Sequence, residues 1–92
     1  MKSLIKFVGT MTSSDVQVLS VSKGTPLCRM SVTAYGKKYN CLLVGHNALH
    51  ALYEIQQHDT LQIIGKMNDR NQLVVSNYRI LRSTYSQPKN FA

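Results

Sequence analysis

The chain is short of acidic residues and contains no tryptophan. Four aspartates and glutamates stand against 11 lysines and arginines, which gives a formal net charge of +7 and a pI near 9.7. Folding does not need this imbalance, because like charges repel one another in the compact state. A polyanionic partner explains it best, and nucleic acid is the commonest one. The alternative is a basic protein that binds nothing anionic.

Cysteines and long apolar runs are also scarce. Two cysteines, Cys28 and Cys41, do not make a disulfide framework, so we expect a reducing compartment. That compartment is the cytoplasm, in association with the nucleoid, or an organelle. The longest uncharged apolar run, residues 41–44, is far below a membrane span. The apolar run at residues 4–8 is interrupted by Lys6 and is too short for a secretory signal.

Signs of catalysis are missing from the sequence. The carboxylates are scattered, and neither a phosphate loop, a nucleophile elbow nor a zinc pattern occurs. His46 and His50 have the spacing of two metal ligands on a helix, but Glu54 is the only nearby residue that could be a third ligand. An ordinary helix surface is the better interpretation. We therefore expect a protein that is not an enzyme and that needs no metal or cofactor.

The pattern of apolar residues predicts a small barrel. Ninety-two residues with 43% hydrophobic content make one domain, and a core this small favours a homo-oligomer, either a homodimer or a homotetramer. The predicted order is three strands, one helix and two strands, with the first strand long and bent. This is the order of the OB-fold, a five-stranded Greek-key barrel with the helix between strands 3 and 4. The predicted elements are a first strand at residues 5–9 that resumes at 16–21, strands at 27–35 and 39–44, a helix at 48–55, and strands at 60–66 and 72–81. We expect this domain to span residues 1–82, with residues 83–92 as a loose tail.

The turn between the second and third predicted strands decides which side chains point outward. A three-residue loop, residues 36–38, pairs Tyr35 with Tyr39 and sends Leu42 inward and Cys41 outward. A two-residue loop, residues 36–37, instead turns Tyr39 inward and Leu42 outward. A shift of one residue exchanges the two faces of a strand. We favour the three-residue loop, because it buries Leu42 and pairs two aromatic rings. Cys28 then points inward and Cys41 outward, which argues against a bridge between them.

The chain also resembles a known family. The resemblance runs from about Ile5 to Leu81 and is to the bacterial single-stranded DNA-binding protein family, including the related small primosomal replication protein. It is carried by four segments of this sequence in their order and spacing: residues 5–9 (IKFVG), 24–32 (GTPLCRMSV), 39–48 (YNCLLVGHNA) and 59–67 (DTLQIIGKM). The resemblance implies a groove across the barrel in which bases stack on aromatic rings and lysines and arginines hold phosphates. The chain departs from the family in lacking tryptophan, in its short hairpin at residues 36–38 and in its C-terminal segment, which is not acidic.

These observations lead to one expected function and two alternatives. We expect non-catalytic binding of single-stranded DNA, with little sequence preference, in DNA replication, recombination or repair. The candidate nucleic-acid-binding residues are Arg29, Tyr35, Lys37, Lys38, Tyr39, Arg70 and Arg79. The first alternative is a primosomal-type adaptor that binds other replication proteins and contacts nucleic acid weakly. The second is single-stranded RNA as the ligand, since the same stacking chemistry serves both nucleic acids.

Overall fold

The computed structural model describes residues 4–83 and consists of strands with one short helix. Its elements are β1 (Ile5–Met11), β2 (Gln17–Ser22), β3 (Thr25–Ala34), β4 (Lys37–Val44), α1 (His46–Glu54), β5 (Thr60–Met67) and β6 (Leu73–Arg82). The predicted tail, apart from Ser83, lies outside the described residues, so the predicted domain boundary stays a prediction.

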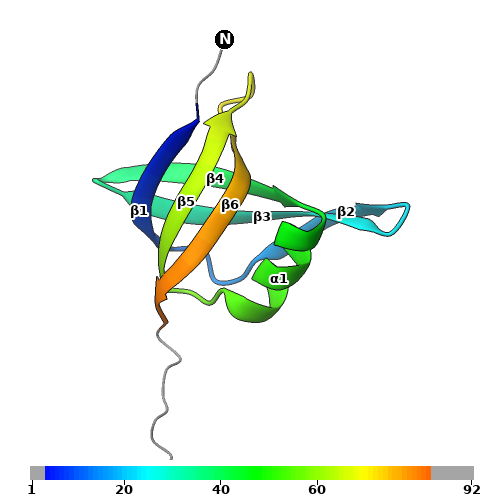
Figure 1. Cartoon of the computed structure of the whole chain (residues 1–92), viewed down its shortest axis with the longest axis horizontal. Coiled ribbons are helices and arrows are strands. Elements are labelled where there is room, and N and C mark those ends of the chain that lie inside the picture. The colour runs from blue at the N-terminus through cyan, green and yellow to red at the C-terminus, as the bar shows by residue number, and fades with distance from the viewer. Residues whose placement is uncertain (1–3, 84–92) are drawn as a thin grey trace, which may run out of the picture.

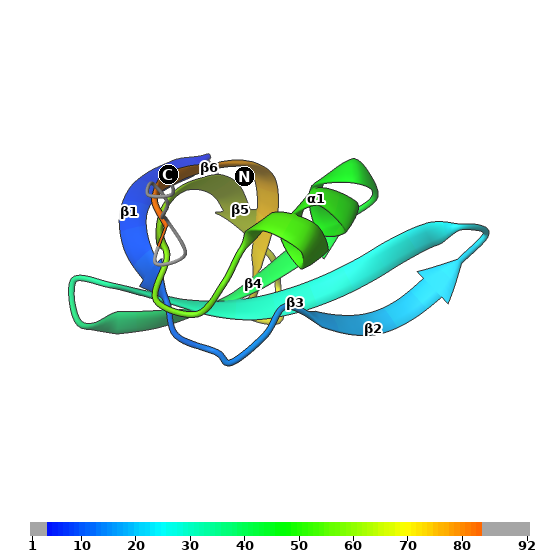
Figure 2. The same cartoon turned by 90° about the horizontal axis from the view of Figure 1, so that it is seen from below.

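The six strands form one sheet that closes on itself. Their order is β1-β5-β6-β4-β3-β2, and an additional pairing between β1 and β3 completes the barrel. All pairings are antiparallel except that between β4 and β6. β1, β5 and β6 cross the long β3–β4 hairpin, and α1 lies beside the end of β4 (Figure 1). The β3–β4 and β2–β3 hairpins extend beyond the barrel in opposite directions (Figure 2).

This arrangement confirms the predicted OB-fold. The long first strand is divided into β1 and β2 by residues 12–16, so the helix follows the fourth strand of the sequence instead of the third. Counted as one strand, β1 and β2 restore the predicted five-stranded order, in which β3 and β4 are strands 2 and 3 of the fold. The interior is lined by apolar side chains from every barrel strand, including Met11, Met30, Leu43, Ile63 and Leu73.

The predicted three-residue loop between β3 and β4 is wrong. Ala34 pairs with Lys37, so the loop has two residues, Tyr35 and Gly36. Both have positive φ, 53° and 76°, as in the type I′ turn that matches the right-handed twist of the flanking strands. The two loops weighed from the sequence both kept Tyr35 in the strand, and this is where the prediction failed.

The observed register reverses the predicted faces of β4. Tyr39 lies opposite Val32, and Cys41 lies opposite Met30, so Tyr39 and Cys41 turn toward the core side. Leu43 fills the interior, whereas Val44 is 49% exposed. The observed faces of β4 are those that we expected for the two-residue loop at residues 36–37, which we did not favour. The predicted pairing of Tyr35 with Tyr39 is therefore absent from the β3–β4 register.

Both cysteines are free and buried, which corrects the prediction that Cys41 points outward. Burial raises the pKa of the Cys41 thiol from 9.0 to about 12, because the thiolate would lose its hydration. Burial raises the pKa of the Cys28 thiol as well. The Cys41 thiol therefore stays protonated in the folded protein over the pH range in which an exposed thiol ionises.

This burial makes the alkaline stability of the protein depend on Cys41. A raised pKa in the folded state contributes stability that is complete below pH 9 and is lost as the pH rises toward 12, because only the unfolded chain releases the proton there. Wild type should therefore lose more stability than Cys41→Ala between pH 8 and pH 10.5, although Cys41→Ala starts lower. Urea melts at both pH values measure the difference. Parallel losses in the two proteins would contradict the buried, protonated thiol.

Candidate nucleic-acid interface

The outward side of the β3–β4 hairpin carries most of the polar and basic residues of the two strands, together with three apolar ones. We call this surface the β3–β4 face; it comprises Leu27, Arg29, Ser31 and Thr33 from β3 and Lys38, Asn40, Leu42 and Val44 from β4. The register places Thr33 opposite Lys38 and Arg29 opposite Leu42. Arg29 Nε donates a hydrogen bond of 2.8 Å to Asn40 Oδ1, which holds the guanidinium against the strand.

A groove lies where residues 12–16 cross this face. Its volume is about 630 Å³. Its lining consists mainly of hydroxyl, amide and charged side chains: Thr12, Ser13, Ser14, Asp15, Gln17, Arg29, Met30, Ser31, Thr33 and Lys38. The lining contains two cations, Arg29 and Lys38, and one acid, Asp15, so its net charge is positive. It therefore suits an anionic ligand.

Hydrogen bonds hold the crossing segment in place. The backbone N–H of Thr12 donates to the carbonyl of Ser31 at 2.8 Å, and the N–H of Ser31 donates to Ser13 Oγ at 3.1 Å. The hydroxyls of Thr12 and Thr33 lie 3.3 Å apart. The groove wall is thus bound to β3 at several points.

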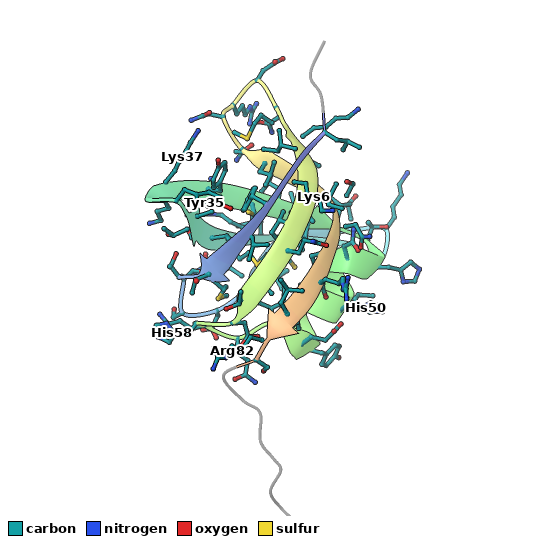
Figure 3. All side chains as sticks on the ribbon, turned by 60° about the vertical axis from the view of Figure 1, so that its left-hand side comes forward. Lys6, Tyr35, Lys37, His50, His58 and Arg82 are labelled. Carbon is teal, nitrogen blue, oxygen red and sulfur yellow. The ribbon has the colours of Figure 1, made fainter. Side chains whose placement is uncertain are left out.

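The structure brings only some of the predicted site residues together. Arg29 and Lys38 both line the groove. Tyr35 lies at the tip of the hairpin, where its side chain is 90% exposed (Figure 3). Lys37 and Tyr39 turn to the opposite side of the hairpin from Lys38, since they pair with Ala34 and Val32.

Tyr39 is engaged within the protein. Its ring stacks on Phe7 of β1 with centroids 4.4 Å apart and an angle of 22° between the planes. Lys37 Nζ lies over the same ring, 5.0 Å from its centroid. These contacts connect the hairpin to β1. A base that stacked on Tyr39 would have to compete with these contacts, so we expect Tyr39 to support the fold and not the ligand.

Arg70 and Arg79 lie apart from the groove. Arg70 belongs to the β5–β6 turn, in which Asn68 Oδ1 accepts the backbone N–H groups of Arg70 and Gln72, each at 2.9 Å. The turn is thereby held in one shape, with the Arg70 side chain exposed. Arg79 lies on the outer side of β6 opposite Gln62 of β5. These two arginines extend the basic surface to a loop and a strand that the groove does not include.

Several residues of the groove were not among the predicted ones. Thr33 and the crossing segment, through Thr12, Ser13, Ser14 and Asp15, contribute its polar lining and its wall. The alternation of β3 already indicated that Thr33 and Arg29 share a face. The crossing segment gave no such signal, because its position depends on hydrogen bonds to a strand 18 residues further along the chain.

The histidines of α1 make no metal site in the described part of the chain, where no group of three or more potential ligands occurs. Glu54 lies 4.0 Å from His50 Nδ1 and accepts a hydrogen bond of 3.2 Å from the Tyr78 hydroxyl. Burial, together with the charge of Glu54, raises the pKa of Tyr78. Glu54 therefore serves to attach α1 to β6. Within residues 4–83, no helix has the length and apolarity needed to cross a membrane.

The fold and the position of the groove define an OB barrel with a groove on the outward face of β3 and β4. In this fold, oligonucleotides and oligosaccharides bind on the face of strands 2 and 3, which are β3 and β4 here. The groove, Arg29 and Lys38 all lie on that face.

Solved structures of the same fold come from single-stranded DNA-binding proteins. The chain is similar to such a domain from Synechococcus sp. (TM-score 0.75, 16% identity, covering 86% of this chain and 94% of that one). It is similar to the mitochondrial single-stranded DNA-binding protein of S. cerevisiae (TM-score 0.76, 11% identity, covering 90% and 98%). It is also similar to the second single-stranded DNA-binding protein of Mycobacterium smegmatis (TM-score 0.70, 11% identity, covering 87% and 89%). No protein-family model and no curated protein sequence matches the chain. At these identities the likeness shows the fold.

Proposed function

We propose that the chain is a non-catalytic protein that binds single-stranded DNA with little sequence preference, on the β3–β4 face. The observation that carries the proposal is the positive groove on strands 2 and 3 of an OB barrel, with Arg29 and Lys38 in its lining. Cations that hold phosphates carry no sequence information. The likeness to single-stranded DNA-binding proteins supports the same ligand.

The proposed binding mode separates phosphate contacts from stacking. Arg29 and Lys38 contact the backbone in the groove, and the exposed ring of Tyr35 stacks on a base at the hairpin tip. Arg70 and Arg79 contact the strand further along its path. The cellular role is to hold strands open and shield them during DNA replication, recombination or repair, in the cytoplasm or an organelle. The proposed protein is a homo-oligomer. β1 pairs with β3 only at Thr10 and Met11, so the rest of that strand edge can pair with another copy of the chain.

A titration against three ligands tests the proposed function. Fluorescent oligo-dT, oligo-U and duplex DNA of equal length are compared at low and moderate salt. Salt-sensitive binding of oligo-dT in preference to duplex is the expected result. Preference for oligo-U would instead identify single-stranded RNA as the ligand. No binding to any of the three at low salt would refute the proposal.

One observation favours the adaptor as a second candidate. Among the strands of residues 4–83, β2 is an edge strand that pairs only with β3, and its side chains Val18, Leu19 and Val21 are 48–64% exposed. An exposed apolar edge of this kind is suited to pairing with another chain. If the chain is an adaptor, we expect Leu19→Lys to abolish capture of a replication protein without changing DNA affinity.

Two neighbouring lysines offer a test of the face. Lys38→Ala should lower the slope of log K against log salt for oligo-dT by about 0.7, the value for one lost contact to a single-strand phosphate. Lys37→Ala removes the same charge from the opposite side of the hairpin and should change the slope less. Fluorescence titrations at four salt concentrations measure both slopes. A larger effect of Lys37→Ala would move the binding surface to the side of Tyr39.

A further inference from the structure

A row of outward-facing residues crosses the five strands of the barrel, with one residue on each strand. Each member is the cross-strand partner of the next, and we call the row the threonine belt: Lys38 (β4), Thr33 (β3), Thr10 (β1), Thr60 (β5) and Arg82 (β6). Opposed residues of neighbouring strands share a face. The neighbours of the threonines along each strand, such as Met11, Val32 and Leu61, are buried, so the threonines themselves point outward. The four spacings between the five strands, about 4.8 Å each, make the belt roughly 20 Å long.

The belt connects the groove to a second basic surface. Its first residue, Lys38, lines the groove, and Thr33 does so as well. Its last residue, Arg82, belongs to the outer side of the three strands β1, β5 and β6, which we call the β1–β5–β6 face. Lys6 of β1 and Arg79 of β6 lie on the same face, each opposite an outward residue of β5. Figure 3 looks onto these strands, with Lys6 on β1 and Arg82 at the end of β6.

The charge of the β1–β5–β6 face has one sign. The three strands contain four lysines and arginines, namely Lys6, Lys66, Arg79 and Arg82, and no aspartate or glutamate. The acids of the chain lie elsewhere, and Asp59 among them is buried. A barrel that needed only the groove for its ligand would gain nothing from a second positive surface, since like charges oppose compaction.

We propose that the threonine belt and the β1–β5–β6 face form a second segment of the DNA path, along which the backbone of the strand bound in the groove continues around the barrel. The proposal rests on the proposed function and extends it to a surface outside the groove. Neutral hydroxyls donate hydrogen bonds to phosphate oxygens without selecting bases. The cation at each end of the belt, Lys38 or Arg82, attracts the backbone electrostatically. Short strands occupy the groove alone, and longer strands reach Arg82.

The dependence of affinity on oligonucleotide length tests the second segment. Oligo-dT from about 4 to about 16 nucleotides covers the site sizes of single OB folds. Arg82→Ala should leave the affinity for the shortest strands unchanged, and for the longest strands it should lower the salt slope by about 0.7. Lys23→Ala, at the tip of the β2–β3 hairpin, removes one charge away from the belt and serves as the matched control.

A second pair of variants tests the hydroxyls without changing charge. Thr60→Val should weaken binding of the longest strands roughly fivefold, the worth of one net hydrogen bond, and the shortest strands not at all. Thr25→Val, on an exposed position of β3 outside the belt, should have no effect at any length. Thermal melts establish that all four variants are folded.

The outcomes separate the two proposals. If wild type binds but Arg82→Ala and Lys23→Ala give the same length dependence, the second segment is refuted and the groove stands. Equal weakening of the shortest and longest strands by Arg82→Ala also refutes it, because Arg82 would then belong to the primary site. If wild type binds no strand of any length, the proposed function fails and the second segment fails with it.

Discussion

Gly65→Ala should destabilise the protein by about 2–3 kcal/mol, because a methyl group at this position has no space. Gly65 lies in β5 beside the β-bulge of β6, where the register shifts between Ile64 and Gly65. A Cβ built on Gly65 meets the backbone carbonyl oxygen of Val74 and comes within 3.1 Å of the Cα of Val75. Backbone atoms of a paired strand cannot turn away as a flexible side chain can. The two strands must therefore separate.

The bulge that crowds Gly65 is fixed from two sides, so it does not relax easily. The Ser76 hydroxyl donates to the carbonyl of Ile64 at 3.1 Å, and Asn47 Nδ2 of α1 donates to the carbonyl of Ser76 at 3.1 Å. Separation of β5 from β6 would strain both hydrogen bonds. A loss of 2–3 kcal/mol in a domain of this size lowers the melting temperature by roughly 10–20 °C.

Thermal and urea melts measure this loss, and Gly24 supplies the control. A Cβ at Gly24 meets nothing within 4 Å, and asparagine tolerates its φ of 77°. Gly24→Asn should therefore stay within about 0.5 kcal/mol of wild type, the usual range for surface substitutions. A similarly small change for Gly65→Ala would show that β5 and β6 are less closely packed at the bulge than described.

The barrel itself could be predicted because its signals are local and repeated. In β3 the alternation of Cys28, Met30, Val32 and Ala34 with polar residues fixes its buried face from the sequence alone, and all four are buried. In β5 the same holds for Leu61 and Ile63. The order of these strands around one helix then leaves few topologies, and the OB barrel is the one observed.

The β3–β4 turn could not be predicted from such signals, because β4 is ambiguous. Residues 41–44 are all apolar, so alternation does not choose between Leu42 and Leu43 for the core. The choice is made by the turn, where Tyr35 adopts a positive φ of 53° that propensity disfavours for a bulky residue. The cross-strand contact of Tyr39 with Phe7, 32 positions earlier, is a tertiary contribution that the local sequence does not contain.

The faces on which the candidate site residues lie could be predicted only in part. Arg29 was placed on the outward face of its strand from alternation alone, and the register agrees. Lys37 and Lys38 were expected to act together, whereas consecutive residues of a strand point to opposite sides. Likewise the two tyrosines, expected as one aromatic pair, occupy separate environments. A single error in the placement of the loop, which begins at Tyr35, accounts for both differences.

This separation gives the two tyrosines opposite expected phenotypes. Tyr39→Ala should cost about 2 kcal/mol of stability, because it removes a half-buried ring and its stacking on Phe7. Its effect on DNA affinity, measured well below the melting temperature, should be small. Tyr35→Ala should leave stability unchanged and weaken binding of oligo-dT by about 1–3 kcal/mol, or roughly 5- to 150-fold, the contribution of one stacked base.

The phenylalanine variants are the controls, since Tyr39→Phe and Tyr35→Phe keep both rings. Each should behave as wild type in urea melts and in titrations with oligo-dT. Loss of DNA binding by Tyr39→Ala at unchanged stability would contradict this assignment. The DNA base would then displace the Lys37 ammonium from the Tyr39 ring and stack there, on the side of the hairpin away from the groove. Because Tyr35 and Tyr39 differ in exposure and not in residue type, the comparison tests the observed register of β4 as directly as it tests the binding mode.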